Sequence, residues 1–141
     1  MNIVLSDEFK NNLQAIIDSF DHESNEATRT HRIVSRILNE IEDLSKLEYS
    51  YIAKQPKHEN KQLDFLLSHK DKEFFIVEAN AKLDTIYLRT HTFKYGCLTD
   101  GFLWLMYEWD GERTKLKKTI VISDAQDIVD YIISKSPNSQ S

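Results

Sequence analysis

The sequence predicts an α+β (mixed α/β) fold in which a central mixed β-sheet is flanked by helices. Two observations predict it. Apolar residues recur at spacings of three and four near both ends of the chain, which is typical of amphipathic helices. Between these segments lie short runs rich in aromatic and β-branched residues, bounded by polar turns, which is typical of strands. Helices and strands alternating in this order favour helices layered on one sheet.

Two helices are expected near the N-terminus. The first covers residues 6–20, with Ser6 as its N-cap and two acids in its first turn. The second runs from about residue 25 to residue 44, because an apolar stripe recurs there at helical spacing. Its outer face carries Arg29, Arg32 and Arg36.

Three strands are expected next, over residues 47–53, 63–67 and 73–79. The last two are expected to form a hairpin that turns at residues 69–72. Residues 74–77 are apolar at four successive positions, which is typical of a strand covered on both faces. The strand over residues 73–79 is therefore expected at the centre of the sheet.

The C-terminal half predicts one weak helix, two hairpins and a last helix. Helical spacing is weak over residues 84–94. Asp100-Gly101 is a two-residue hairpin signal, and Asp110-Gly111 marks a second turn before a strand over residues 117–122. Ser123 or Asp124 is expected to cap the last helix. Residues 1–135 thus form one predicted domain, and residues 136–141 a flexible tail.

The composition predicts one globular domain in the cytoplasm with no membrane partner. The chain has 141 residues, of which 40% are hydrophobic and 29% charged. No apolar run approaches the roughly 20 residues of a membrane span, and the N-terminus lacks the features of a signal peptide. The single Cys97 excludes an internal disulfide, and the five histidines, which lack ligand spacing, are expected at the surface. A net charge of −5 argues against charge-driven coating of nucleic acid without excluding a local basic patch.

Two acids inside apolar strands are candidate metal ligands. Asp64 interrupts the apolar run over residues 63–67, and Glu78 follows directly on residues 74–77. A buried carboxylate is destabilising unless it is paired or binds a cation. Acids on adjacent strands of a hairpin can share one hard divalent ion, and Mg²⁺ fits their oxygen ligands best. The alternative is that one or both acids merely cap a strand end or form surface ion pairs.

Three further residues are candidates for the same site. Asn80 and Lys82 share a face with Glu78 if the strand continues that far. A lysine beside two metal-bound acids can position a water nucleophile or stabilise charge on a phosphate, although a solvated lysine is the commoner explanation. Glu26, in the first turn of the second helix, either reaches the metal through water or interacts with the helix dipole.

These residues resemble the PD-(D/E)XK nuclease core, in which an Asp and an acid-x-Lys motif hold Mg²⁺ for phosphodiester hydrolysis. Asp64 and the segment Glu78-Ala79-Asn80 carry the resemblance. Within that superfamily the chain is more similar to the N-terminal nuclease domain of type I restriction enzyme R subunits. Residues 25–29 with the apolar stripe after them resemble that group's first helix, and residues 97–107 resemble its Leu-Thr-Asn-Gly turn and later strand pair. The similarity covers residues 25–109.

The resemblance implies a restriction-endonuclease-like fold that acts on DNA. It also implies Mg²⁺, or Mn²⁺, bound by Asp64, Glu78, the Ala79 carbonyl and Glu26. Asn80 stands where the family has its catalytic lysine, and the nearest lysine is Lys82.

Three hypotheses follow from these residues. The first is an endodeoxyribonuclease in which Lys82 replaces the motif lysine. The second is a catalytically inactive relative, in which Asn80 hydrogen-bonds the acids. Its fold would bind DNA, a protein partner or a second copy of the chain in restriction-modification, phage defence or a mobile element. The third is a subunit or inhibitor whose acidic surface occupies the DNA channel of another protein.

Overall fold

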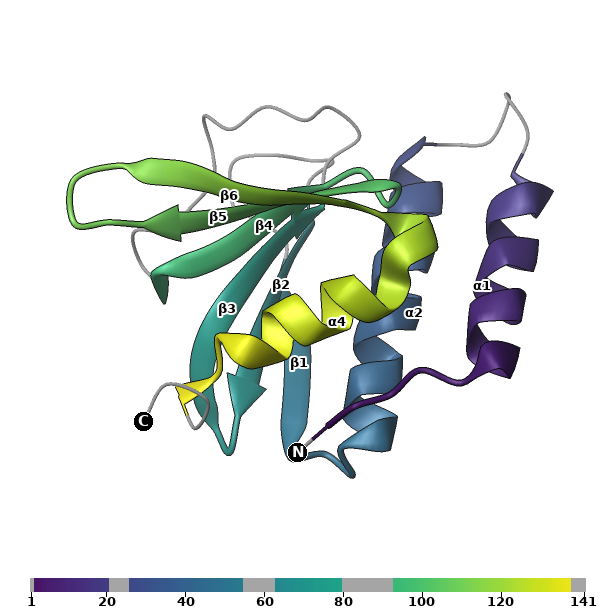
Figure 1. Ribbon diagram of the computed structural model, residues 1–141, viewed down its shortest axis with the longest axis horizontal. Coiled ribbons are helices and arrows are strands. Elements are labelled where there is room, and N and C mark those ends of the chain that lie inside the picture. The colour runs from purple at the N-terminus through teal and green to yellow at the C-terminus, as the bar shows by residue number, and fades with distance from the viewer. Residues whose placement is uncertain (1, 21–25, 55–62, 80–92, 138–141) are drawn as a thin grey trace.

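The chain forms a six-stranded mixed sheet with helices against it. The computed structural model describes residues 2–20, 26–54, 63–79 and 93–137, and for residues 26–28, 54, 63 and 64 it describes the backbone only. The helices are α1 (Asp7–Ser19), α2 (Glu26–Leu44) and α4 (Ala125–Ser134), with a short 3-10 helix η2 (Ile122–Asp124) before α4. Figure 1 shows α4 crossing one face of the sheet, with α2 beside it and α1 outside α2. The predicted fold class is confirmed.

The sheet consists of two antiparallel meanders joined by one parallel pair. Its order is the order of the sequence, and every neighbouring pair is antiparallel except β3 with β4. Because β3 and β4 are parallel, their carboxyl ends meet at the same edge of the sheet. The strands are β1 (Tyr49–Lys54), β2 (Leu63–His69), β3 (Lys72–Ala79), β4 (Tyr95–Thr99), β5 (Leu103–Trp109) and β6 (Thr114–Val121).

The main core lies between the helices and one face of the sheet. The apolar stripe of α2 packs there with residues of α4, β3 and β4, and β3 occupies an inner position as the sequence predicts. The β2–β3 hairpin turns at Lys70 and Asp71, which both have positive φ, as the turns that match strand twist require. The buried residues of the α2 stripe are Ile33, Val34, Ile37, Leu38 and Ile41.

Most predicted element boundaries lie within two residues of those in the structure. Ser6 is the N-cap of α1 and accepts a hydrogen bond from the Phe9 amide. The first strand starts two residues late, because Leu47 has a φ of 66° and lies in the turn before it. The predicted two-residue turn at Asp100 is wrong, since Thr99 pairs with Trp104 and four residues separate them. The last strand begins at Thr114, three residues earlier than predicted, because residues 114–116 pair with β5.

Two residues expected at the surface or in the tail are buried. His69 is only 4% exposed, so the prediction of a surface histidine is wrong there. Ser136 is also buried and accepts a hydrogen bond from the Tyr49 hydroxyl at 2.9 Å, so the ordered chain continues past residue 135. Most of the helix expected over residues 84–94 lies outside the described residues. Among the described helices, none has the length and apolar character needed to cross a membrane.

Candidate functional site

Asp64 and Glu78 are direct register partners in the antiparallel β2–β3 pair. Direct partners lie on the same face of a sheet, with Cβ atoms about 4.5–5.5 Å apart. The next residues on either side of Glu78, Val77 and Ala79, belong to the core under the helices. Glu78 therefore belongs to the opposite face, and the two candidate acids share that face.

Glu78 is a buried acid in an apolar neighbourhood. Its side chain is 1% exposed, and its register partner on β4 is the fully buried Leu98. Burial raises the pKa of the Cys97 thiol well above its usual value, and the negative charge of Glu78 raises it further. Cys97 consequently stays protonated and is a core residue rather than a nucleophile. The Glu78 carboxylate therefore acts electrostatically on a neighbouring core side chain.

Lys54 is a residue that the sequence analysis did not identify. It ends β1 and is the direct register partner of Asp64. Lys54, Asp64 and Glu78 are thus consecutive partners in one row across three strands. Opposite charges in direct register attract each other across an antiparallel sheet. Only the strand pairing identifies this lysine, because the sequence pattern does not give the register of β1 against β2.

The N-terminal half of α2 lies at the same end of the sheet as the two acids. The Thr30 hydroxyl donates to the Asp100 carbonyl oxygen at 2.8 Å, directly after β4 ends. Thr99, the last residue of β4, is the register partner of Ala79 at the end of β3. Ligands of open α/β sheets bind outside the carboxyl ends of the strands, which is where these elements meet.

The turn after β4 is held by its own polar groups. The Thr99 hydroxyl accepts from the Gly101 amide, and the Asp100 carboxylate accepts from the amides of Phe102 and Leu103 at 2.9 Å. The Trp104 indole donates to the Gly101 carbonyl oxygen at 3.1 Å. These bonds explain why four residues, rather than two, separate the paired ends of β4 and β5.

The structure places only part of the site predicted from the sequence. It brings together Asp64, Glu78 and Ala79, since Ala79 follows Glu78 and is buried at the end of β3. Glu26 is the first residue of α2, one turn before Thr30, and only its backbone is described. Asn80 and Lys82 lie outside the described residues.

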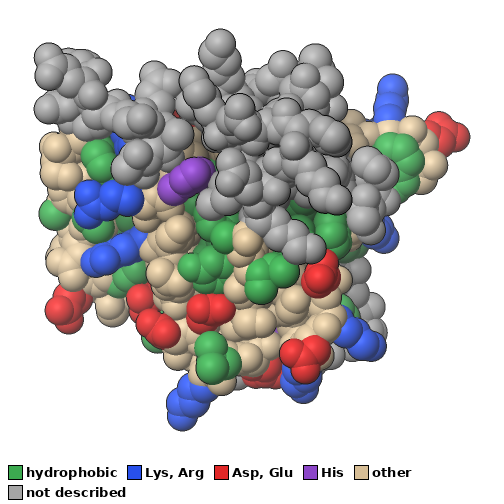
Figure 2. Space-filling view, turned by 180° about the vertical axis from the view of Figure 1, so that it is seen from behind, with side chains coloured by type: hydrophobic (Ala, Val, Ile, Leu, Met, Phe, Trp, Pro, Cys, Tyr) green, Lys and Arg blue, Asp and Glu red, His purple; other side chains and the backbone are tan. Residues whose placement is uncertain are grey.

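The far face of the sheet has a small apolar cluster beside the acids. Leu98 and Tyr107 form it, with Leu105 packed against them. Figure 2 shows the side turned away from α4, where hydrophobic side chains gather next to residues that are not described. Glu78 therefore lies next to this apolar cluster, because Leu98 is its register partner on β4.

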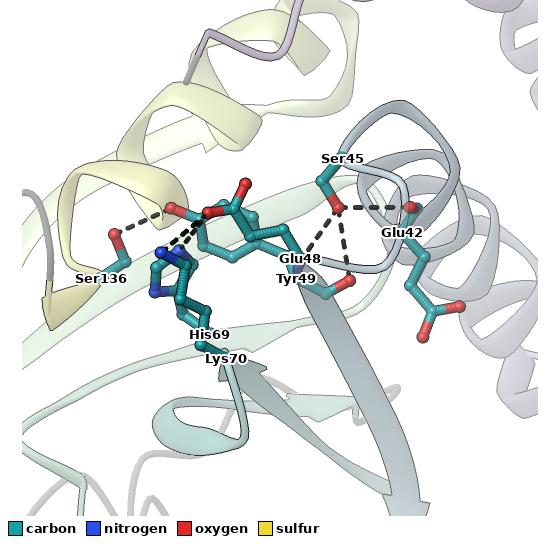
Figure 3. Close-up of polar contacts among 7 residues, drawn as sticks. All are labelled: Glu42, Ser45, Glu48, Tyr49, His69, Lys70 and Ser136. Atoms are coloured by element: carbon teal, nitrogen blue, oxygen red, sulfur yellow. Dashed lines mark hydrogen bonds and ion pairs between the residues drawn. The ribbon is translucent and has the colours of Figure 1, made fainter.

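A second polar cluster lies at the opposite end of β2. The His69 Nε2 and Lys70 Nζ atoms are 3.3 and 3.5 Å from the Glu48 Oε1 atom. Figure 3 shows these two side chains converging on Glu48, with the Tyr49 hydroxyl directed at Ser136. The cluster joins the end of α2, the β2–β3 hairpin and the residues after α4, so its role is structural. Within the described ranges, no three His, Cys, Asp or Glu side chains are grouped as a metal site would require.

Comparisons with known proteins give no relative for this chain: no family model, curated protein or solved structure matches it.

Proposed function

We propose that this chain is a Mg²⁺-dependent DNA nuclease-like domain that hydrolyses phosphodiester bonds. The observation that carries the proposal is the direct register of Asp64 with Glu78, together with the burial of Glu78. Two acids on one face of neighbouring strands can share one cation through their oxygen ligands. The resemblance of Asp64 and Glu78 to the PD-(D/E)XK motif supports the same function. We further propose a cytoplasmic location, which the unpaired Cys97 supports.

The donor groups at this position fit a hard divalent cation. Asp64, Glu78 and the Ala79 carbonyl would hold Mg²⁺, or Mn²⁺, with Glu26 as a further candidate acid. Carboxylate and carbonyl oxygens are the ligands these ions prefer. When bound, the ion would stabilise negative charge on a phosphoryl oxygen.

The row of register partners consists of charged residues, and Glu78 in that row is buried. Lys54 is the register partner of Asp64, and a lysine ammonium at this position would attract the negative phosphate backbone. The apolar neighbours of Glu78 on β3 and β4 exclude water, which strengthens interactions with charge that develops during hydrolysis.

The metal proposal is tested by Glu78→Gln and Asp64→Asn, with Glu73→Gln as the matched control. Glu73 lies on the same strand, is exposed and pairs with Ser68 at the other end of β2. Mg²⁺ or Mn²⁺ should raise the unfolding temperature of the wild type and of Glu73→Gln, because a ligand that binds only the folded state stabilises it. The stabilisation should disappear in Glu78→Gln.

Cleavage of supercoiled and linear DNA provides the second measurement. Removal of a direct ligand should cost more than the roughly 10–100-fold that loss of an outer-shell partner costs. Cleavage that survives Glu78→Gln, with a thermal shift equal to that of the wild type, would exclude the proposed centre.

A catalytically inactive binding module is the second candidate function. Asn80 at the motif lysine position favours it. This candidate retains the metal-dependent thermal shift and binds DNA, a protein partner or a second copy of the chain, but it cleaves nothing. DNA binding without cleavage by the wild type in Mg²⁺ and in Mn²⁺ would therefore select this candidate over the nuclease.

A further inference from the structure

Arg29 has an unusual environment for an arginine near the start of a helix. Its guanidinium carbon lies 4.8 Å from the centroid of the Phe102 ring, on the turn that follows β4. Its Nε atom is buried and has no hydrogen-bond partner, a property that it shares with only one other side-chain atom among the described residues, the Tyr131 hydroxyl. No acid in the described part of the chain forms an ion pair with Arg29.

The ring beneath Arg29 is held in place. The Phe102 amide donates to the Asp100 carboxylate at 2.9 Å, and the Asp100 carbonyl accepts from Thr30, the neighbour of Arg29 on α2. Two successive residues of α2 therefore contact one turn. Stacking on an aromatic face restricts the plane of the guanidinium, and a fixed plane orients its remaining donors.

The position of this arginine relates it to the candidate acids. The turn that carries Phe102 begins directly after Thr99, and Thr99 is the register partner of Ala79. Arg29 thus lies at the end of the sheet where β3 and β4 finish. An arginine fork matches the oxygens of a phosphate, and a buried N–H without an acceptor gains when a ligand supplies one.

We propose that Arg29 is a phosphate-binding residue, whose guanidinium, stacked on Phe102, donates to a phosphodiester oxygen of DNA bound at the Asp64–Glu78 end of the sheet. This inference deepens the proposed function and rests on it for the identity of the ligand. Arg29 is a binding residue in this proposal, and it acts on the phosphate backbone without reading base sequence.

Arg32 provides a matched control. It lies one turn further along α2 and is also stacked on an aromatic ring, 5.7 Å from the Phe20 centroid. Unlike Arg29, it is exposed, and its polar atoms are not among the buried unpartnered ones. Arg29→Gln and Arg32→Gln therefore make the same change of charge on the same helix, at positions that differ in burial and in distance from the turn after β4.

The test measures binding of a labelled DNA duplex to the full chain in EDTA, so that cleavage does not contribute. Between about 50 and 200 mM NaCl, loss of one phosphate contact should make the slope of log affinity against log salt less steep by about 1. Arg29→Gln should show this change and bind about tenfold more weakly at low salt. Arg32→Gln should resemble the wild type. Equal effects of the two variants, or an unchanged slope in Arg29→Gln, would overturn the inference.

Two further measurements guard against a variant that fails to fold. Phe102→Leu retains Arg29 but removes the stacked ring, and it should weaken binding by a smaller factor than Arg29→Gln. In the wild type, the Arg29 Nε–Hε resonance should shift on addition of the dinucleotide TpT, while that of Arg32 stays in place. A wild type in which neither resonance moves and no duplex binds would also overturn the inference. Salt-dependent binding through Arg29 without metal-dependent cleavage would instead leave the inference standing and exclude the nuclease.

Discussion

Thr30 and Asp100 fix the start of α2 to the turn between β4 and β5. Their hydrogen bond, at 2.8 Å, joins residues 70 positions apart in the chain. It holds the start of α2, which carries Arg29, close to the end of β4. The end of β4 lies beside the end of β3, where Glu78 is the second-last residue. A small residue is needed beside it, because the backbone at Gly101 lies against Thr30 and Ile33.

Gly101→Ala should destabilise the protein more than Gly111→Ala. Both glycines have a φ near +100°, which is strained for any other residue and costs about 1–3 kcal/mol. A Cβ at Gly101 would also lie 3.2 Å from Ile33 Cδ1 and 3.4 Å from Thr30 Cα, whereas a Cβ at Gly111 meets nothing within 4 Å. Urea unfolding of the two variants provides the comparison, and equal losses of stability would show that α2 moves away at little cost.

The register of Lys54 predicts that Lys54→Gln lowers DNA cleavage by about 100-fold, the effect of removing one charge-stabilising group. The Mg²⁺-dependent thermal shift should remain, because the acids stay in place. Lys82→Gln is the comparison that the sequence analysis suggests. Loss of cleavage in Lys82→Gln with normal activity in Lys54→Gln would assign the catalytic role to Lys82 instead.

Tyr49 and Tyr131 should respond differently to loss of their hydroxyl groups. Tyr49→Phe removes the hydrogen bond to Ser136 and should cost about 1 kcal/mol. The Tyr131 hydroxyl is buried without a hydrogen-bond partner; burial, helped by the Glu108 charge, raises the pKa of Tyr131 to about 12. Tyr131→Phe should therefore leave the urea midpoint unchanged or raise it. A loss comparable with that of Tyr49→Phe would contradict this assignment.

The β5–β6 turn should weaken in acid. The amides of Arg113 and Glu112 and the Lys115 ammonium, 2.9 Å away, hold the pKa of Asp110 well below its ordinary value. Because the folded pKa is the lower one, this stabilisation is present above the unfolded pKa of about 3.9 and is lost as the pH falls through the folded value. An NMR titration of the carboxyl groups should place Asp110 below that reference. Asp110→Ala should remove the acid-dependent change in amide exchange at Arg113, and a change that persists would assign it to another group.

The layered fold could be predicted because its signals are local. Four successive apolar residues in β3 indicate a strand with two covered faces, and that strand is an inner one. Ser6 caps α1 as expected, since the cap and its amide are three residues apart. The pairing of Asp64 with Glu78 could also be predicted from the sequence, because a short hairpin brings their two strands together.

The features that the sequence did not reveal depend on partners far along the chain. His69 is buried because Glu48 and Tyr49 lie beside it, about twenty residues away in sequence. Lys54 joins the row of acids only through the register of β1 with β2. The length of the turn after β4 depends on side-chain oxygens of Thr99 and Asp100, which accept hydrogen bonds from backbone amides. Hydrophobic periodicity does not predict such hydrogen bonds.

The single parallel pairing between β3 and β4 has a consequence for the order in which the candidate site assembles. Each antiparallel meander can form from strands that are adjacent in sequence. The parallel β3–β4 pair requires closure of a longer loop and is therefore expected to form slowly. Asp64, Glu78 and Arg29 precede that junction in the chain, and Phe102 follows it. A newly made chain would therefore have both acids in adjacent strands before the Phe102 ring stacks on Arg29. The phosphate contact proposed for Arg29 would be fully assembled only in the final folding step.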